Sequence, residues 1–286
     1  MLSSRVVLIS KCAGRRFLSV PVWATVNPDT MSSAAPAIGK NLVGGTWMET
    51  KTQHTVIDPL NGDPFMLVPN TAEDEIGPYV ERMKTCPRSG LHNPIKNVER
   101  YNMLGEVMVK GAHELGKPEV AEFFAKLIQR LVPKSYPQCI GEPTVTRKWM
   151  ENYGCDQVRY LARSFGIPGD HSGQTSVGMR MPFGAVSVIT PFNFPLEICA
   201  LQTCSALFMG NQPLCKVDWK VAICMEQFIR MLHHVVSLLN VADRMGLARR
   251  GWDGAVARRW RGEAGWVGSR WDAARWGTGV GYYEMG

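Results

Sequence analysis

The sequence contains no run of about 18 consecutive apolar residues, the minimum length for a helix that spans a membrane. Its 286 residues include eight cysteines but no Cys-X-X-Cys pair, which argues against a disulfide-rich scaffold and against a zinc site. His233 and His234 are the only adjacent histidines, and neighbours on a helix point in different directions, so we expect no metal centre. With 45% hydrophobic and 20% charged residues, the composition is that of a folded globular protein.

The net charge of +7 is confined to the two ends of the chain. Residues 1–40 carry a formal charge of +4 and residues 244–286 also carry +4, whereas the part between them, 41–243, carries −1. Because the central part is nearly neutral, we expect no nucleic-acid-binding surface on the folded core.

The first 27 residues hold four basic residues, several serines and no acidic residue. The apolar residues alternate with the charges instead of forming one long stretch, which is typical of an organellar transit peptide and not of a secretory signal. We therefore expect 1–27 to be a transit peptide that lies outside the fold and directs the protein to the mitochondrial matrix. The alternative is a disordered tail with no targeting role.

The last segment, 244–286, lacks lysine, isoleucine, phenylalanine, asparagine and proline, yet holds 10 of the 28 glycines and 5 of the 9 tryptophans. It shows neither strand nor helix periodicity. Since codons for Gly, Arg, Ala and Trp are rich in G and C, this change indicates a frame shift or a read-through intron, and we predict a disordered tail. The alternative is an RNA-binding tail with stacking tryptophans. Its stretch 277–281 resembles a dinucleotide loop, but no strand is expected before it and no helix after it.

Between these ends, residues 41–243 follow the pattern of an α/β protein. Alternating strand and helix patterns joined by short links from residue 184 onward are typical of a parallel βαβα unit. The fold class is therefore an incomplete Rossmann-like parallel sheet with flanking helices, preceded by short N-terminal strands and a helical segment. The predicted strands are 41–48, 55–58, 185–190 and 213–217, and the predicted helices are 97–115, 119–132, 149–165, 195–209 and 221–236.

Two polar residues follow the two parallel strands, where ligands of open α/β sheets bind. Asn193 offers a primary amide, a neutral donor that can stabilise a developing oxyanion. The helix after it begins with free N–H groups that favour an anion. Lys216, at the end of the second strand, offers a cation suited to ribose hydroxyls or phosphates. By spacing alone, Asn193 can equally be a turn residue and Lys216 a solvated charge.

The sequence resembles the NAD-dependent aldehyde dehydrogenase superfamily. The resemblance is carried by the stretches 182–184, 191–195 and 210–211 together with Lys216. The resemblance extends over about 41–243. Within that superfamily, the chain is most similar to the plant-type mitochondrial 1-pyrroline-5-carboxylate dehydrogenases.

The resemblance implies NAD-dependent oxidation of glutamate 5-semialdehyde, which is in equilibrium with 1-pyrroline-5-carboxylate, to glutamate in proline breakdown. It implies that Asn193 donates to the oxyanion of the attacked aldehyde. Thr190, Pro191 and Phe192 would line the nicotinamide side of the cofactor channel, and Lys216 would reach the adenosine ribose. The parent enzyme is expected to be a homo-oligomer.

The chain departs from the superfamily at two points. Many relatives continue after the lysine with Pro-Ala-Glu, whose glutamate contacts the ribose, whereas residues 217–219 here are Val-Asp-Trp. The nucleophilic cysteine and the base glutamate would lie beyond residue 243, where the composition changes. Cys139 follows a glutamine as the nucleophile does in relatives, but it precedes Asn193 and is no substitute. We therefore expect a truncated chain that is itself inactive, or alternatively a non-catalytic partner of the intact enzyme.

Overall fold

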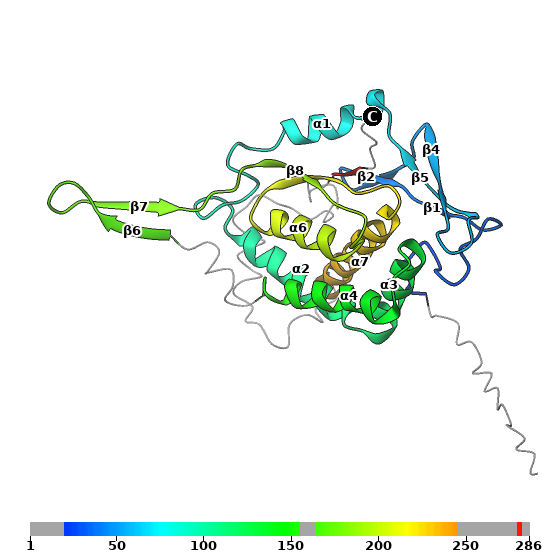
Figure 1. The fold of residues 1–286 in the computed structure, drawn as a ribbon. Helices are drawn as coiled ribbons and strands as arrows, with labels where there is room; N and C mark the ends of the chain where they lie inside the picture. The colour runs from blue at the N-terminus through cyan, green and yellow to red at the C-terminus, as the bar shows by residue number, and fades with distance from the viewer. Residues whose placement is uncertain (1–19, 155–163, 245–278, 282–286) are drawn as a thin grey trace, which may run out of the picture.

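The computed structural model describes residues 20–154, 164–244 and 279–281 (Figure 1). The strands are β1 (Ala37–Ile38), β2 (Asn41–Val43), β3 (Thr46–Met48), β4 (Thr52–Ile57), β5 (Pro64–Asn70), β6 (Ser164–Pro168), β7 (Thr175–Met179), β8 (Ala185–Ile189), β9 (Gln212–Lys216) and β10 (Gly279–Gly281). The helices are the short η1 (Glu73–Glu75), α1 (Gly77–Lys84), α2 (Glu99–Leu115), α3 (Pro118–Leu131), α4 (Tyr136–Glu151), α6 (Glu197–Phe208) and α7 (Ala222–Arg244).

The main sheet has the strand order β3-β2-β10-β9-β8. Strands β8, β9 and β10 are parallel, whereas β2 pairs antiparallel with β10. Helix α6 connects β8 to β9 and packs beside them, and α1 lies across the opposite side of the sheet (Figure 1). The predicted α/β class and the parallel βαβα unit of β8, α6, β9 and α7 are confirmed.

Two glycines divide the first predicted strand, 41–48, into a hairpin. Gly44 and Gly45 have φ angles of 57° and 83°, which a two-residue turn of this kind requires and which side chains disfavour. Strands β2 and β3 therefore pair antiparallel through the turn. A second, three-stranded sheet of order β1-β5-β4 lies beside them, and its strand β5 was not predicted because Pro64 and Pro69 interrupt the strand pattern.

The helical layer contains two helices that the apolar spacing predicted and one that it did not. Helices α2 and α3 confirm the expected segments 97–115 and 119–132 within two residues. Helix α4 was missed because Pro137, Gly141 and Pro143 weaken the helical pattern, although Pro137 occupies the first turn, where proline is tolerated. Within the described residues, no helix is both long and apolar enough to cross a bilayer.

One continuous helix over 149–165 is contradicted at both of its ends. Helix α4 ends at Glu151, and Ser164 begins β6, whereas 155–163 lie outside the described residues, so the helix stays a prediction there. Gly166 and Pro168 lie in β6. That strand pairs with β7 in an antiparallel hairpin that projects from the body (Figure 1), so Phe165 and its neighbours follow a period of two.

The expected boundary of the leader at residue 27 is also wrong, because residues 20–27 belong to the fold. The Trp23 ring is buried, stacked on Phe124 at 5.7 Å between centroids and edge-on to Phe123 at 5.4 Å. The backbone N–H of Thr25 donates to Oε1 of the buried Gln227 on α7 at 2.9 Å, and Gln227 Nε2 donates to Thr25 Oγ1 at 2.9 Å. Residues 1–19 lie outside the described part, so the transit peptide stays a prediction for them.

The expectation that 244–286 has no regular structure is contradicted at three residues. Gly279–Gly281 form β10, which lies between β9 and β2, with Val280 opposite Cys215 on one side and Leu42 on the other. Residues 279–281, the described part of the stretch that resembles a dinucleotide loop, thus form a strand. Residues 245–278 and 282–286 lie outside the described residues, so the out-of-frame origin stays a prediction.

We predict that Trp23→Ala lowers the free energy of unfolding by roughly 3 kcal/mol or more, because it removes a large buried ring and leaves a cavity. Val22→Ala is the matched control, since Val22 is 88% exposed and one residue away. The measurement is urea denaturation of both variants and of the unmodified chain. Equal midpoints for all three would show that the N-terminal segment does not pack as described.

Candidate active site and cofactor site

The carboxyl ends of β8 and β9 lie side by side. Ile189, the last residue of β8, is opposite Lys216, the last residue of β9. The backbone N–H of Thr190 donates to the Lys216 carbonyl oxygen at 3.1 Å, which extends the ladder by one bond. The structure therefore brings the predicted residues Thr190 and Lys216 to one edge of the sheet.

Asn193 lies in the turn between β8 and α6, and its side chain is exposed. Its amide forms no hydrogen bond with another described residue, so both amide hydrogens can reach a ligand. A turn asparagine normally bonds to its own backbone, as Asn61 Oδ1 does here by accepting the N–H of Asp63 at 2.9 Å. The exposed, unbonded amide therefore favours the donor role over the turn role.

The residues expected on the nicotinamide side differ in their exposure to solvent. Thr190 is buried, and its hydroxyl faces the Cys199 thiol with no nitrogen or oxygen partner among the described residues. Pro191 and Phe192 are exposed, and Lys220 Nζ lies 5.8 Å from the centroid of the Phe192 ring. These three residues place a buried hydroxyl beside exposed apolar rings, and such a surface suits an aromatic ligand.

Lys216 is half-buried, and in the described part of the chain its ammonium has no carboxylate partner. The Asp218 carboxylate is used locally, because its Oδ1 accepts the backbone N–H of Lys220 at 3.0 Å. A cation and a free amide along one sheet edge are donors to which the oxygens of phosphates, ribose hydroxyls and a nicotinamide amide can bind. The residues present therefore fit a dinucleotide.

Two of the recognised motif stretches lie at the opposite, amino ends of the strands and have structural roles. The Gly184 N–H donates to Asn211 Oδ1 at 3.1 Å, which joins the starts of β8 and β9. Gly210 has a φ of 92°, and a Cβ there would lie 2.0 Å from the His92 carbonyl oxygen. These residues set the register of the strands and do not reach the ligand edge.

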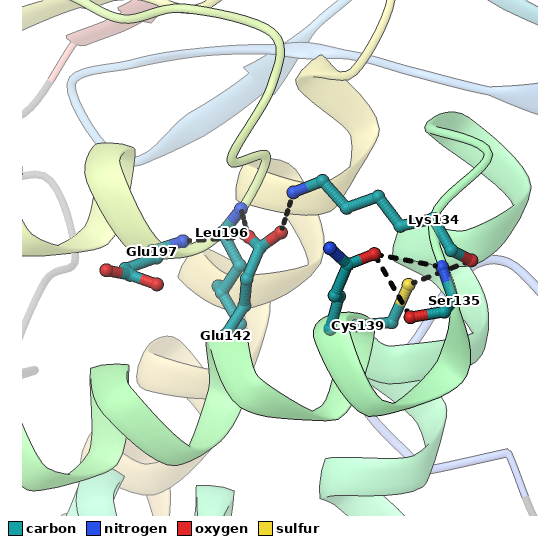
Figure 2. Close-up of polar contacts among 7 residues, drawn as sticks. Lys134, Ser135, Cys139, Glu142, Leu196 and Glu197 are labelled. Atoms are coloured by element: carbon teal, nitrogen blue, oxygen red, sulfur yellow. Dashed lines mark hydrogen bonds and ion pairs between the residues drawn. The ribbon is translucent and has the colours of Figure 1, made fainter.

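A carboxylate of the protein occupies the amino end of α6. Glu142 Oε2 on α4 accepts the backbone N–H groups of Leu196 and Glu197 at 3.1 and 3.3 Å (Figure 2). Glu142 Oε1 forms an ion pair with Lys134 Nζ at 2.9 Å. Two of the N–H groups at this helix start are therefore already bonded to a carboxylate of the protein, which leaves fewer of them for an anionic ligand than the sequence suggested.

Glu142 and Lys134 are functional candidates that sequence reasoning missed. The segment after Pro133 carried no predicted element, so nothing placed a carboxylate there. The signal that was available is the pair itself, a lysine and a glutamate eight residues apart on either side of a capping serine, Ser135. Burial and the charge of Glu142 raise the pKa of the neighbouring Glu197.

The cysteines do not supply a nucleophile at this edge. Burial raises the pKa values of Cys139, Cys204 and Cys224, that of Cys204 to about 12. Cys215 differs, because hydrogen bonds from Cys199 and the Thr203 hydroxyl stabilise its thiolate and lower its pKa.

The half-buried Cys86 lies near Gln212, at the start of β9 and thus at the opposite end of that strand from Lys216. In the described ranges, no three His, Cys, Asp or Glu side chains gather as metal ligands do.

Comparison with known proteins identifies the family of the chain. The sequence profile of the aldehyde dehydrogenase family matches residues 47–240. The chain is 56% identical over 229 residues to a probable aldehyde dehydrogenase of Linum usitatissimum, covering 80% of this chain and 42% of that protein. It is 53% identical over 216 residues to the mitochondrial delta-1-pyrroline-5-carboxylate dehydrogenase 12A1 of Arabidopsis thaliana, covering 76% and 39%.

Solved structures show the same fold at low identity. An NADP-dependent glyceraldehyde-3-phosphate dehydrogenase from Bacillus halodurans, complexed with NADP, gives a TM-score of 0.56 at 21% identity over 70% of this chain and 41% of that one. A Thermus thermophilus 1-pyrroline-5-carboxylate dehydrogenase mutant gives 0.56 at 15% identity over 73% and 39%. The chain spans about two fifths of the length of these relatives. Because the family profile covers most of the sequence, the chain belongs to the aldehyde dehydrogenase family.

Proposed function

We propose that this chain is the cofactor-binding part of an NAD-dependent aldehyde dehydrogenase that oxidises glutamate 5-semialdehyde to glutamate in the mitochondrial matrix. The observation that carries the proposal is the exposed, unbonded amide of Asn193 at the strand edge that also holds Lys216. The substrate and the compartment are supported by 53% identity to a mitochondrial delta-1-pyrroline-5-carboxylate dehydrogenase.

In this proposal each residue has one role. The Asn193 amide donates to the aldehyde oxygen and stabilises the negative charge that develops there, without a change in its own protonation. Thr190, Pro191 and Phe192 line the nicotinamide side, and Lys216 binds the adenosine ribose. The bound NAD would supply the hydride acceptor.

A nucleophile for the aldehyde carbon is not found beside Asn193 among the described residues. A reactive cysteine has to be accessible and at least partly ionised. Most of the described thiols are buried with raised pKa values, and Cys215, whose pKa is lowered, is enclosed within the sheet. The chain alone is therefore expected to bind the cofactor but not to turn over the substrate.

We predict that the purified chain binds NAD and that Lys216→Ala weakens this binding about tenfold, because a charged hydrogen bond to the ribose is lost. Lys110→Ala is the control, since Lys110 is an exposed lysine of α2 that pairs with Glu106. Calorimetric titration with NAD measures both. Equal affinities for the two variants would contradict the assignment of the cofactor site.

We predict no NADH formation when the chain is mixed with NAD and 1-pyrroline-5-carboxylate. The reason is the lack of an accessible thiolate near Asn193 in the described structure. Absorbance at the NADH band measures the rate. Turnover that is lost in Asn193→Ala would refute the inactivity of the chain while supporting the proposed reaction.

We also propose that the β6–β7 hairpin binds a second subunit, either another copy or an intact relative of this chain. Phe165, Ile167 and Val177 are 64%, 54% and 59% exposed on this projecting hairpin, although apolar side chains of this size are normally covered. A homo-oligomer of the parent enzyme would cover them.

We predict that Phe165→Ser with Val177→Ser lowers the molar mass in solution to that of a monomer, whereas the unmodified chain is larger. Ile57→Ser is the control, because Ile57 is 49% exposed on β4, away from the hairpin. Light scattering after size exclusion measures the mass. A monomeric unmodified chain would exclude self-association through the hairpin.

A further inference from the structure

The turn that carries Asn193 is held at both of its ends. At its start, the Thr190 N–H is bonded to the Lys216 carbonyl oxygen on β9. At its end, the N–H groups of Leu196 and Glu197 are bonded to the Glu142 carboxylate on α4. Only the five residues 191–195 lie between these anchors, and the first and last of them are prolines with restricted φ.

The second anchor is an ion pair, which we call the Glu142 clamp: Glu142, Lys134 and the two N–H groups that Glu142 accepts. The Glu142 side chain is 1% exposed and that of Lys134 17%. The Lys134 carbonyl oxygen accepts hydrogen bonds from Gln129 Nε2 at 3.3 Å and from the Cys139 thiol at 3.8 Å. The backbone of Lys134 is therefore held, and its side chain reaches from the link between α3 and α4 toward the turn (Figure 2).

The clamp also contacts the turn directly. Lys134 Nζ lies 4.1 Å from the centroid of the Phe194 ring, a cation–π contact with the residue next to Asn193. On the other side of Asn193, Lys220 lies over the Phe192 ring. Both aromatic neighbours of Asn193 are thus in contact with lysines from other segments, one just before α4 and one just before α7.

A buried ion pair is a poor source of stability, because the loss of hydration offsets most of the attraction between the charges. The ion pair contributes to orientation instead. Because the Glu142 carboxylate accepts from three donors at once, it fixes where α6 begins. A shift of α6 by one residue would move Asn193 away from the edge that it shares with Lys216.

We propose that Glu142 and Lys134 are positioning residues that hold the Asn193 amide toward the nicotinamide side of the cofactor site. The inference rests on the proposed function, because it assigns that amide to the reacting end of the cofactor. It predicts that the clamp affects the nicotinamide half of the ligand and not the adenosine half, which Lys216 contacts from β9.

The chain contains a matched control for the clamp. Glu226 on α7 is 0% exposed, pairs with Arg230 at 2.8 Å, and accepts the backbone N–H of Lys40 at 2.8 Å. Arg230 in turn lies 4.1 Å above the ring of Trp47. This second group has similar chemistry, a buried carboxylate between a cation and a backbone N–H group, but it anchors the N-terminal segment and not the turn.

The first test is hydrogen exchange of the backbone amides in Glu142→Gln and Glu226→Gln, followed by mass spectrometry. Glu142→Gln keeps the size of the side chain but replaces one acceptor oxygen with a donor, so Leu196 and Glu197 should exchange about tenfold faster or more. In Glu226→Gln these two amides should exchange as in the unmodified chain. Unchanged exchange in Glu142→Gln would overturn the anchoring role.

The second test compares NADH with ADP-ribose, which lacks the nicotinamide ring. Glu142→Gln should bind NADH about fivefold or more weakly and ADP-ribose as the unmodified chain does, while Glu226→Gln should not change the ratio of the two affinities. If Glu142→Gln does not fold, Phe194→Ala should show the same difference, with weaker binding of NADH and unchanged binding of ADP-ribose. Equal weakening of both ligands, or none, would overturn the positioning role. Failure of the unmodified chain to bind either ligand would refute the proposed function. The exchange rates of Leu196 and Glu197 would still show whether Glu142 anchors the turn.

Discussion

The parallel pairing of β8 with β9 is the constraint on which the site depends. It brings Thr190 and Lys216 to one edge and directs the turn after β8 outward, so that Asn193 is exposed there. The register is set at the other end of the strands, where the Asn211 side chain accepts the Gly184 N–H. Since side chains alternate along a strand, a slip of one residue would turn Lys216 away from this edge.

The helical layer adds the second constraint, because it holds the end of the turn that carries Asn193. Helix α4 packs against α6 and carries Glu142, so the packing of two helices sets the direction of a backbone segment in the site. Hydrogen bonds between a carboxylate and helix N–H groups are short-ranged and directional. Small shifts of α4 are therefore transmitted to Asn193, and the two layers have to fit together for the site to form.

The sequence predicted the elements whose pattern is local. Strands β8 and β9 and helices α2, α3, α6 and α7 follow from apolar spacing, and Asn193 and Lys216 follow from their places after the strands. Helix α4 and strand β5 were missed because prolines interrupt their patterns, and tertiary packing overrides that signal. The Glu142 clamp was missed with α4, since its contacts join residues 54 and 55 positions apart in the sequence.

Two exposed apolar residues lie at the same edge as the site. Ile189 and Phe192, at the end of β8 and after it, are 61% and 52% exposed, whereas β9 is covered on its other side by β10. In the longer relatives, of which this chain spans about two fifths, additional chain is available to cover such an edge. An exposed apolar rim next to free polar donors is typical of a surface that another segment or subunit completes. In the proposed function, Asn193 and Lys216 supply donors for the oxyanion and the cofactor at this edge, and a nucleophile would have to come from a segment or subunit that covers it.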